Sequence, residues 1–187
     1  MLDQEVLPLA VAMARWHEFY TLLGTAAATL VALMFVAASV AVGLLTSDRS
    51  IGTRIYMSPV IMHYASVLFV SLIALVPSLP DRGLGLVIVA SGLVGFGYSV
   101  YISIKLFRDI KSEFVDRFAY GAWPFVAYAG AVAGGLLIAD SERWGPDVLA
   151  AAMLLLILVN LRNAWDLTVT FARRHSDTRN ANQPPSS

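Results

Sequence analysis

Five long runs of apolar residues dominate the chain and are separated by short polar segments. Each run approaches the roughly 20 residues that a helix needs to cross about 30 Å of hydrocarbon. The runs are continuous and do not alternate between apolar and polar residues, which favours helices over the strands of a membrane barrel. The pattern therefore predicts an all-α, polytopic transmembrane bundle of about five spans. The spans cover residues 19–45, 59–79, 84–106, 122–139 and 148–171.

The two ends of the chain differ from the spans between them. Residues 1–18 carry apolar side chains at helical spacing on one face, so we expect an amphipathic helix at the membrane interface. Residues 19–172 form the expected five-helix transmembrane domain. The segment 173–187 is polar and contains two consecutive prolines, and we expect it to be a disordered cytoplasmic tail.

Composition excludes several classes of protein. Of the 187 residues, 58 % are hydrophobic and 14 % are charged, whereas soluble domains have about 25 % charged residues, so a water-soluble domain is excluded. The net charge is +0, which gives no basic field for nucleic acid. The absence of cysteine excludes disulfides and thiolate chemistry. We find no catalytic motif, so we expect a protein that is not an enzyme and that holds no cofactor or metal.

The basic residues are unevenly distributed between the two sides of the membrane. If the N-terminus lies outside the cytoplasm, nine of the 13 Lys and Arg residues fall in cytoplasmic segments and three fall in outer segments. The remaining one, Arg162, lies within the last span. The positive-inside rule therefore predicts an outer N-terminus and a cytoplasmic C-terminus.

The polar residues within the spans gather toward the cytoplasmic side. Arg162 and Asp166 are four residues apart on the last span, and Asn160 and Asn163 lie beside them. His63 lies at the cytoplasmic start of the second span. Together these five residues predict a cytoplasm-facing polar pocket. The alternative is that Arg162 pairs locally and reaches the headgroups, while His63 is a hydrogen-bonded contact between helices.

Small residues at helical spacing predict close packing between helices. Gly130 and Gly134 form a GxxxG pattern, and Ser91, Gly95 and Ser99 follow one another at intervals of four. These stripes are expected to pack within one bundle; the alternative is that one of them faces another subunit or lines a pore. We expect a homo-oligomer in the lipid bilayer, with another membrane protein as an alternative partner.

Three stretches of the chain carry a resemblance to known proteins: residues 19–37 (FYTLLGTAAATLVALMFVA), 57–63 (MSPVIMH) and 162–166 (RNAWD). Through them the chain resembles small multispan proteins of the bacterial inner membrane, a group of uncharacterised function. Some similar sequences are labelled modulators of a membrane protease. The resemblance implies a location in the bacterial inner (plasma) membrane and carries over no functional residue.

Two functions from different classes agree with these patterns. The shared depth of the intramembrane polar residues favours a channel or transporter for a small solute or ion. The alternative is a regulatory or interaction module without transport, which binds another membrane protein through its glycine stripes.

Overall fold

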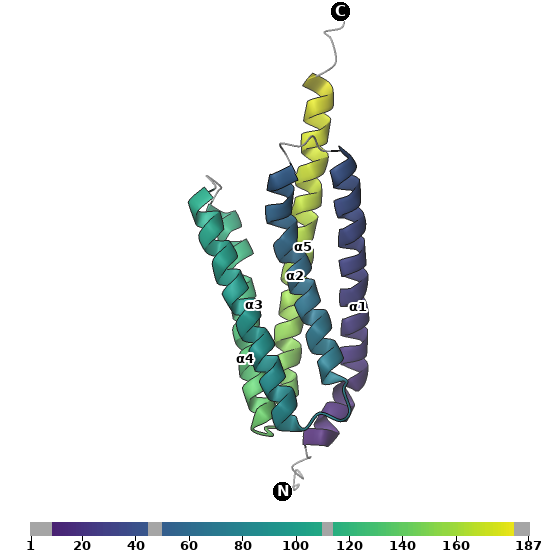
Figure 1. The fold of residues 1–187 in the computed structure, drawn as a ribbon, viewed down its shortest axis with the longest axis vertical. Helices are drawn as coiled ribbons and strands as arrows, with labels where there is room; N and C mark the ends of the chain where they lie inside the picture. The colour runs from purple at the N-terminus through teal and green to yellow at the C-terminus, as the bar shows by residue number, and fades with distance from the viewer. Residues whose placement is uncertain (1–8, 45–49, 110–113, 182–187) are drawn as a thin grey trace, which may run out of the picture.

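The computed structural model describes residues 9–44, 50–109 and 114–181, which form five helices and two of the turns between them (Figure 1). The described residues contain no strand, and each helix contains most of one of the five apolar runs; the second run, 59–79, continues past the end of its helix at Ala74. The predicted all-α fold class is therefore confirmed. In chain order the helices are α1 (Leu9–Leu44), α2 (Ser50–Ala74), α3 (Asp81–Asp109), α4 (Phe114–Ala139) and α5 (Gly145–Ala181).

All five helices extend beyond the spans that the apolar pattern marks, and α1 and α5 extend the furthest. α1 begins at Leu9 and runs into the first span without a break, so no separate surface helix precedes it from Leu9 onward; residues 1–8 lie outside the described part. α5 is helical to Ala181, although its polar composition predicts disorder from residue 173; residues 182–187 lie outside the description. Between Pro146 and Pro184 the chain has no proline or glycine to interrupt the helical hydrogen bonds.

The helices form an elongated bundle in which neighbours in sequence pack against each other (Figure 1). α3 packs along α4, α4 also packs along α5, and α1 packs along α2. α2 contacts both α3 and α5 and so joins the two groups. The Tyr20 hydroxyl donates a hydrogen bond to the Pro146 carbonyl at 3.1 Å, which ties α1 to the first turn of α5.

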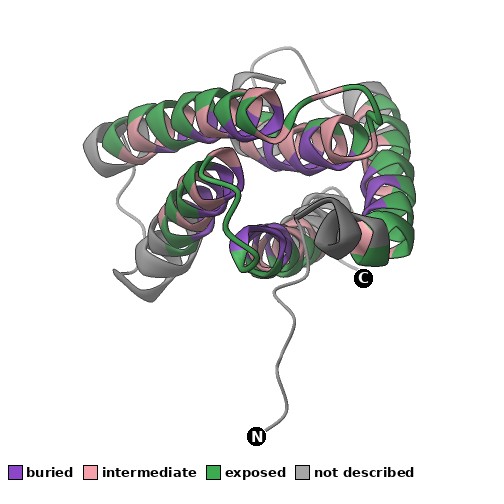
Figure 2. Ribbon diagram, turned by 90° about the horizontal axis from the view of Figure 1, so that it is seen from below, coloured by how far each residue is buried: buried purple, intermediate pink, exposed green. Residues whose placement is uncertain are grey.

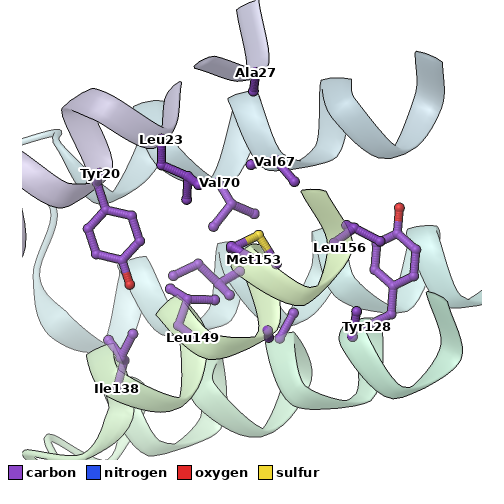
Figure 3. Close-up of a cluster of buried hydrophobic side chains, with 14 of the residues drawn as sticks. Tyr20, Leu23, Ala27, Val67, Val70, Tyr128, Ile138, Leu149, Met153 and Leu156 are labelled. Carbon is purple, nitrogen blue, oxygen red and sulfur yellow. The ribbon is translucent and has the colours of Figure 1, made fainter. Parts of the chain in front are cut away.

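The main core contains side chains from all five helices, and Figure 3 labels members from α1, α2, α4 and α5. It combines aromatic, branched and small residues that are almost completely buried. Burial of this apolar surface against other helices depends on shape, because lipid tails are as apolar as the core itself. The labelled members of the cluster are Tyr20, Leu23, Ala27, Val67, Val70, Tyr128, Ile138, Leu149, Met153 and Leu156.

Glycines allow the helix backbones to approach one another closely. A Cβ added at Gly134 would lie 2.8 Å from the backbone nitrogen of Leu149, and one added at Gly130 would lie 3.0 Å from the Cβ of Ala152. Both contacts are with α5. Between α3 and α4, a Cβ at Gly85 would overlap the carbonyl oxygen of Gly135. The glycine stripe of α4 therefore packs inside the chain, as small residues do at membrane helix interfaces.

The outer surface of the bundle is apolar. Figure 2 shows buried residues on the inner sides of the helices and exposed residues around the outside. The exposed residues include many large hydrophobic side chains, among them Leu22, Phe35, Leu93 and Leu158. In the described part, three helices are long and apolar enough to cross a membrane: Arg15–Ser39, Asp81–Ile104 and Gly145–Asp166. An apolar exterior of this extent fits lipid and not water, which supports a membrane protein.

The hydroxyl groups on the outer face of α1 have partners within their own helix. Thr21, Thr25, Thr29 and Ser39 are exposed, and each donates a hydrogen bond to the carbonyl four residues earlier. The four donor–acceptor distances are 2.8, 2.8, 2.9 and 2.9 Å. Such back-bonding satisfies a hydroxyl that has no water around it, so these residues are compatible with a lipid-facing surface.

Candidate functional site

A chain of hydrogen bonds connects α2 and α4 in the interior of the bundle. His63 Nδ1 lies 2.8 Å from the Tyr128 hydroxyl, which donates to Ser66 Oγ at 3.1 Å. Ser66 in turn donates to the carbonyl of Met62 at 2.9 Å. His63 is only 5 % exposed and Tyr128 is 1 % exposed. The contact between His63 and Tyr128 is therefore buried between packed helices, whereas the bond from Ser66 to Met62 is exposed.

The order of these hydrogen bonds determines which nitrogen of His63 carries the proton. Tyr128 has a single hydroxyl proton and donates it to Ser66, so its oxygen accepts the bond from His63. Nδ1 is then the protonated nitrogen of the neutral imidazole, and Nε2 keeps a lone pair. The chain of bonds therefore orients the imidazole and leaves Nε2 as an acceptor.

Tyr98 on α3 also contacts His63. Its ring meets the His63 ring edge to face, with the ring centroids 6.4 Å apart. The Tyr98 hydroxyl lies 3.0 Å from Ser58 Oγ on α2. Three helices thus contribute polar groups around one histidine. We name the set His63, Ser66, Tyr98 and Tyr128 the histidine cluster.

Gly95 provides the space in which the Tyr128 ring lies. A Cβ added to Gly95 would overlap three atoms of that ring. The ring reaches His63 on α2 from α4, and α3 lies beside it. A side chain at this position of α3 would displace the ring and the hydroxyl with it. Gly95 is therefore a positioning residue for the histidine cluster.

Four buried polar atoms lack a hydrogen-bond partner among the described residues: Tyr64 OH, Ser71 Oγ, Ser99 Oγ and Asn160 Oδ1. Asn160 is completely buried, and its Nδ2 donates to the Leu156 carbonyl at 2.8 Å. An unsatisfied polar atom in an apolar environment costs about 1–3 kcal/mol, so these atoms have unused capacity to bind a polar group. Tyr64 and Val60 form a second buried cluster, and Ile157 and Ala164, which flank Asn160 on α5, pack against that cluster.

The structure separates the five expected pocket residues into two groups. His63, Asn160 and Asn163 are buried in the bundle. Arg162 and Asp166 lie on the outer surface, where their side chains are 66 % and 46 % exposed. Their ion pair is long, at 4.0 Å between Nε and Oδ2. The structure thus brings the two charged residues to each other but not into the interior with His63.

The expected packing residues of α3 also have distinct environments. Ser91 donates to the carbonyl of Ile88 at 2.8 Å, within its own helix. Ser99 is 5 % exposed and its hydroxyl has no partner among the described residues. Gly95 contacts a tyrosine ring on the neighbouring helix, whereas Gly130 and Gly134 contact α5.

The predicted pocket left out the residues that contact His63. His63 and Ser66 are three residues apart on a helix, a spacing that places them on one face. That spacing was a usable signal for Ser66. The contribution of Tyr128 depends on how α4 packs against α2, which the order of residues does not reveal. Within the described residues, no group of three or more His, Cys, Asp or Glu could hold a metal ion.

Removing the Tyr128 hydroxyl is expected to destabilise the bundle. Tyr128→Phe keeps the ring but leaves the Nδ1–H of His63 without its acceptor. Hydrogen bonds between membrane helices contribute about 0.6 kcal/mol on average and up to about 1.7 kcal/mol, so we expect a loss of about 1–2 kcal/mol. Reversible unfolding in mixed micelles measures it. Tyr101→Phe, which alters an exposed tyrosine, is the matched control and is expected to change nothing; equal effects of the two would contradict the assignment.

Comparison of the chain with models of protein families, with curated proteins and with solved structures finds no match.

Proposed function

We propose that the chain is a five-span protein of the bacterial inner membrane, with an outer N-terminus and a cytoplasmic C-terminus. Besides the three long apolar helices, α2 and α4 contribute shorter apolar segments, Ser58–Ala74 and Trp123–Ala139. Both segments pack against the longer helices, and successive helices alternate in direction along the bundle (Figure 1). The excess of basic residues on one side supports the orientation.

The orientation can be tested with reporters fused after Ser187. A reporter that is active only in the cytoplasm is expected to be active there, and one that needs the periplasm is expected to be inactive. The reverse pattern would contradict the proposed outer N-terminus and cytoplasmic C-terminus. Fusions after Ser78, in the described turn between α2 and α3, serve as the control because they are expected to give the opposite result.

Within this bundle, we propose that the histidine cluster binds a small solute or ion during its passage across the membrane. The observation that carries the proposal is the buried His63, whose imidazole is oriented by its hydrogen bond with Tyr128. A polar cluster at membrane depth opposes stability in lipid, so its presence favours a role beyond packing. Asn160 Oδ1 and Ser99 Oγ supply further unsatisfied oxygen atoms in the interior.

The donor and acceptor groups of the buried polar residues define the class of solute. Nε2 of His63 and Oδ1 of Asn160 can only accept hydrogen bonds, whereas the hydroxyls of Ser99 and Tyr64 can donate or accept. Arg15, Arg82, Arg143 and Arg162, the basic residues whose side chains the structure describes, are all exposed, so none of them compensates the charge of an anion in the interior. The cluster therefore suits a small hydrogen-bond donor, either neutral or a monovalent cation.

Flux into liposomes that contain the purified protein tests this proposal. Methylammonium and glycerol are the donor probes, and acetate is the anionic probe. We expect entry of at least one donor above that of protein-free liposomes, and no increase for acetate. His63→Phe, which keeps a ring but removes both nitrogens, should abolish the increase, whereas Tyr101→Phe should preserve it. Absence of flux with the parent protein, or equal flux with His63→Phe, would refute the proposal.

The alternative function, an interaction module, needs a surface other than the glycine stripe of α4. Gly130 and Gly134 are in contact with α5 of the same chain, so a partner helix cannot occupy that stripe while the bundle is folded. Association with a second copy or with another membrane protein would have to use the apolar outer faces. The buried histidine cluster is therefore the better-supported basis for a function.

A further inference from the structure

The outer face of α5 changes in chemistry toward the end of its apolar span. Leu158 and Leu161 are exposed, and the exposed residues Arg162 and Trp165 follow them. Trp165 is 68 % exposed. We name these four residues the α5 anchor face. It combines apolar side chains, a guanidinium group and an indole, the three components that suit the boundary between lipid tails and headgroups.

The depth of the α5 anchor face follows from helix geometry. At 1.5 Å per residue, Arg162 lies about 26 Å along the helix from Gly145, and Asp166 lies about 32 Å from it. The hydrocarbon layer is about 30 Å thick, so both residues fall at its edge when the helix starts at the opposite edge. Trp144, immediately before α5, is also exposed, with Arg143 above its ring at 4.7 Å. Tryptophans therefore bracket the span at both ends.

Arg162 has guanidinium N–H groups that its ion pair with Asp166 does not use. Its guanidinium has five N–H groups in a planar fork that matches the oxygen atoms of a phosphate. Its pair with Asp166 is 4.0 Å long, and both side chains are largely exposed, so it leaves most of these donors for another acceptor. The Trp165 indole N–H can donate beside it. A negatively charged group with several acceptor oxygens is the complement of this arrangement.

We propose that the α5 anchor face binds the headgroup phosphate of an anionic phospholipid at one edge of the bilayer. Arg162 donates to the phosphate oxygens, Trp165 lies among the glycerol and carbonyl groups, and the two leucines contact the acyl chains. The assignment explains why the charged pair lies outside the bundle while Asn160 and Asn163 lie inside. It does not depend on the solute proposed for the histidine cluster.

Depth-dependent quenching of Trp165 fluorescence tests the proposal. The other three tryptophans are replaced by phenylalanine, and the protein is placed in bilayers with bromine at defined depths in the acyl chains of phosphatidylcholine. We expect the strongest quenching from bromine near the headgroup. Strongest quenching from the bilayer centre would overturn the proposal, and so would no quenching at any depth, because a protein neighbour would then cover the face.

Lipid selectivity provides the second measurement. One arginine near an anionic surface is expected to give about a five-fold preference for brominated phosphatidylglycerol over brominated phosphatidylcholine. Arg162→Gln should remove this preference, while the matched control Arg143→Gln, at the other end of α5, should retain it. Equal quenching by the two lipids, or unchanged preference in Arg162→Gln, would overturn the proposal.

Native mass spectrometry keeps the test decisive if the protein with one tryptophan does not fold. The parent protein and Arg162→Gln, both with all four tryptophans, are compared in detergent with added phosphatidylglycerol. A fall of about five-fold in the affinity for the bound lipid in Arg162→Gln supports the proposal. The same affinity in both proteins overturns it. Free inorganic phosphate is added as a competitor, and loss of bound lipid on its addition would show that the acyl chains and Trp165 contribute nothing.

Discussion

Gly95→Ala is expected to destabilise the protein by about 2 kcal/mol and to break the contact between His63 and Tyr128. The added methyl group would overlap the Tyr128 ring, so the ring must leave its position between α3 and α2. Overpacking of this kind costs about 1–3 kcal/mol. The lost hydrogen bond adds up to about 1.7 kcal/mol, and the better helix propensity of alanine returns up to about 1 kcal/mol. Unfolding in mixed micelles measures the difference.

Gly97→Ala is the control for this prediction. Gly97 lies two residues further along α3, and a Cβ there would meet no atom within 4 Å. Because an interior helical glycine is less stable than alanine by about 0.5–1 kcal/mol, we expect Gly97→Ala to stabilise the protein slightly. If Gly95→Ala lowers the free energy of unfolding and Gly97→Ala raises it, the loss at position 95 is due to the contact with Tyr128. Destabilisation of similar size at both positions would contradict the role assigned to Gly95.

A double substitution separates the two parts of the Gly95 effect. Tyr128→Leu removes the ring as well as the hydroxyl, so a methyl at position 95 then has room. Gly95→Ala should cost much less in the Tyr128→Leu background than in the parent, and the two changes should not be additive. Flux into liposomes should fall in Gly95→Ala as we expect it to fall in His63→Phe, because the imidazole loses the group that orients it. Normal flux in Gly95→Ala would show that the contact between His63 and Tyr128 stabilises the fold but is not needed for flux.

The apolar runs predict the helices because the length and continuity of a run are local properties of the sequence. The positions of Arg162 and Asp166 were also accessible to local reasoning. At 100° per residue, the midpoint of Asn160 and Asn163 is about 110° away from the midpoint of Arg162 and Asp166. The two pairs therefore lie on different faces, and in the structure one is buried while the other is exposed. Depth within the membrane was a poor guide because it ignores direction around the helix.

The histidine cluster was only partly predictable, for a different reason. His63 is conspicuous as a polar residue in an apolar run, but its partner is 65 residues away on another helix. The contact depends on the absence of a side chain at Gly95, and a glycine in a stripe of small residues gives no indication of which ring it accommodates. Contacts of this kind follow from the packing of three helices together. A single sequence does not contain that information in readable form.

Replacing both Gly130 and Gly134 by leucine is expected to prevent folding of the bundle. Around Gly134 the backbone of α5 leaves no room, because a Cβ would lie 2.8 Å from the nitrogen of Leu149 and 3.0 Å from its Cα. Backbone cannot rotate aside as a side chain can, so α4 and α5 must separate along the core that contains Leu149 and Met153. We expect a loss above about 3 kcal/mol, at or beyond the upper end of overpacking costs.

Ala133→Leu distinguishes this intramolecular packing from binding of a partner. Ala133 is adjacent to Gly134 but exposed, so leucine there should be tolerated in lipid. The yield of monodisperse protein and its helicity are measured for Ala133→Leu and for the double glycine variant, and they distinguish the two explanations. If the glycines served a partner, the leucine variants would remain folded and lose only that partner. Because the two glycines hold α4 against α5, we expect the opposite: the folded protein itself is lost, while Ala133→Leu stays folded and keeps whatever associations the parent has.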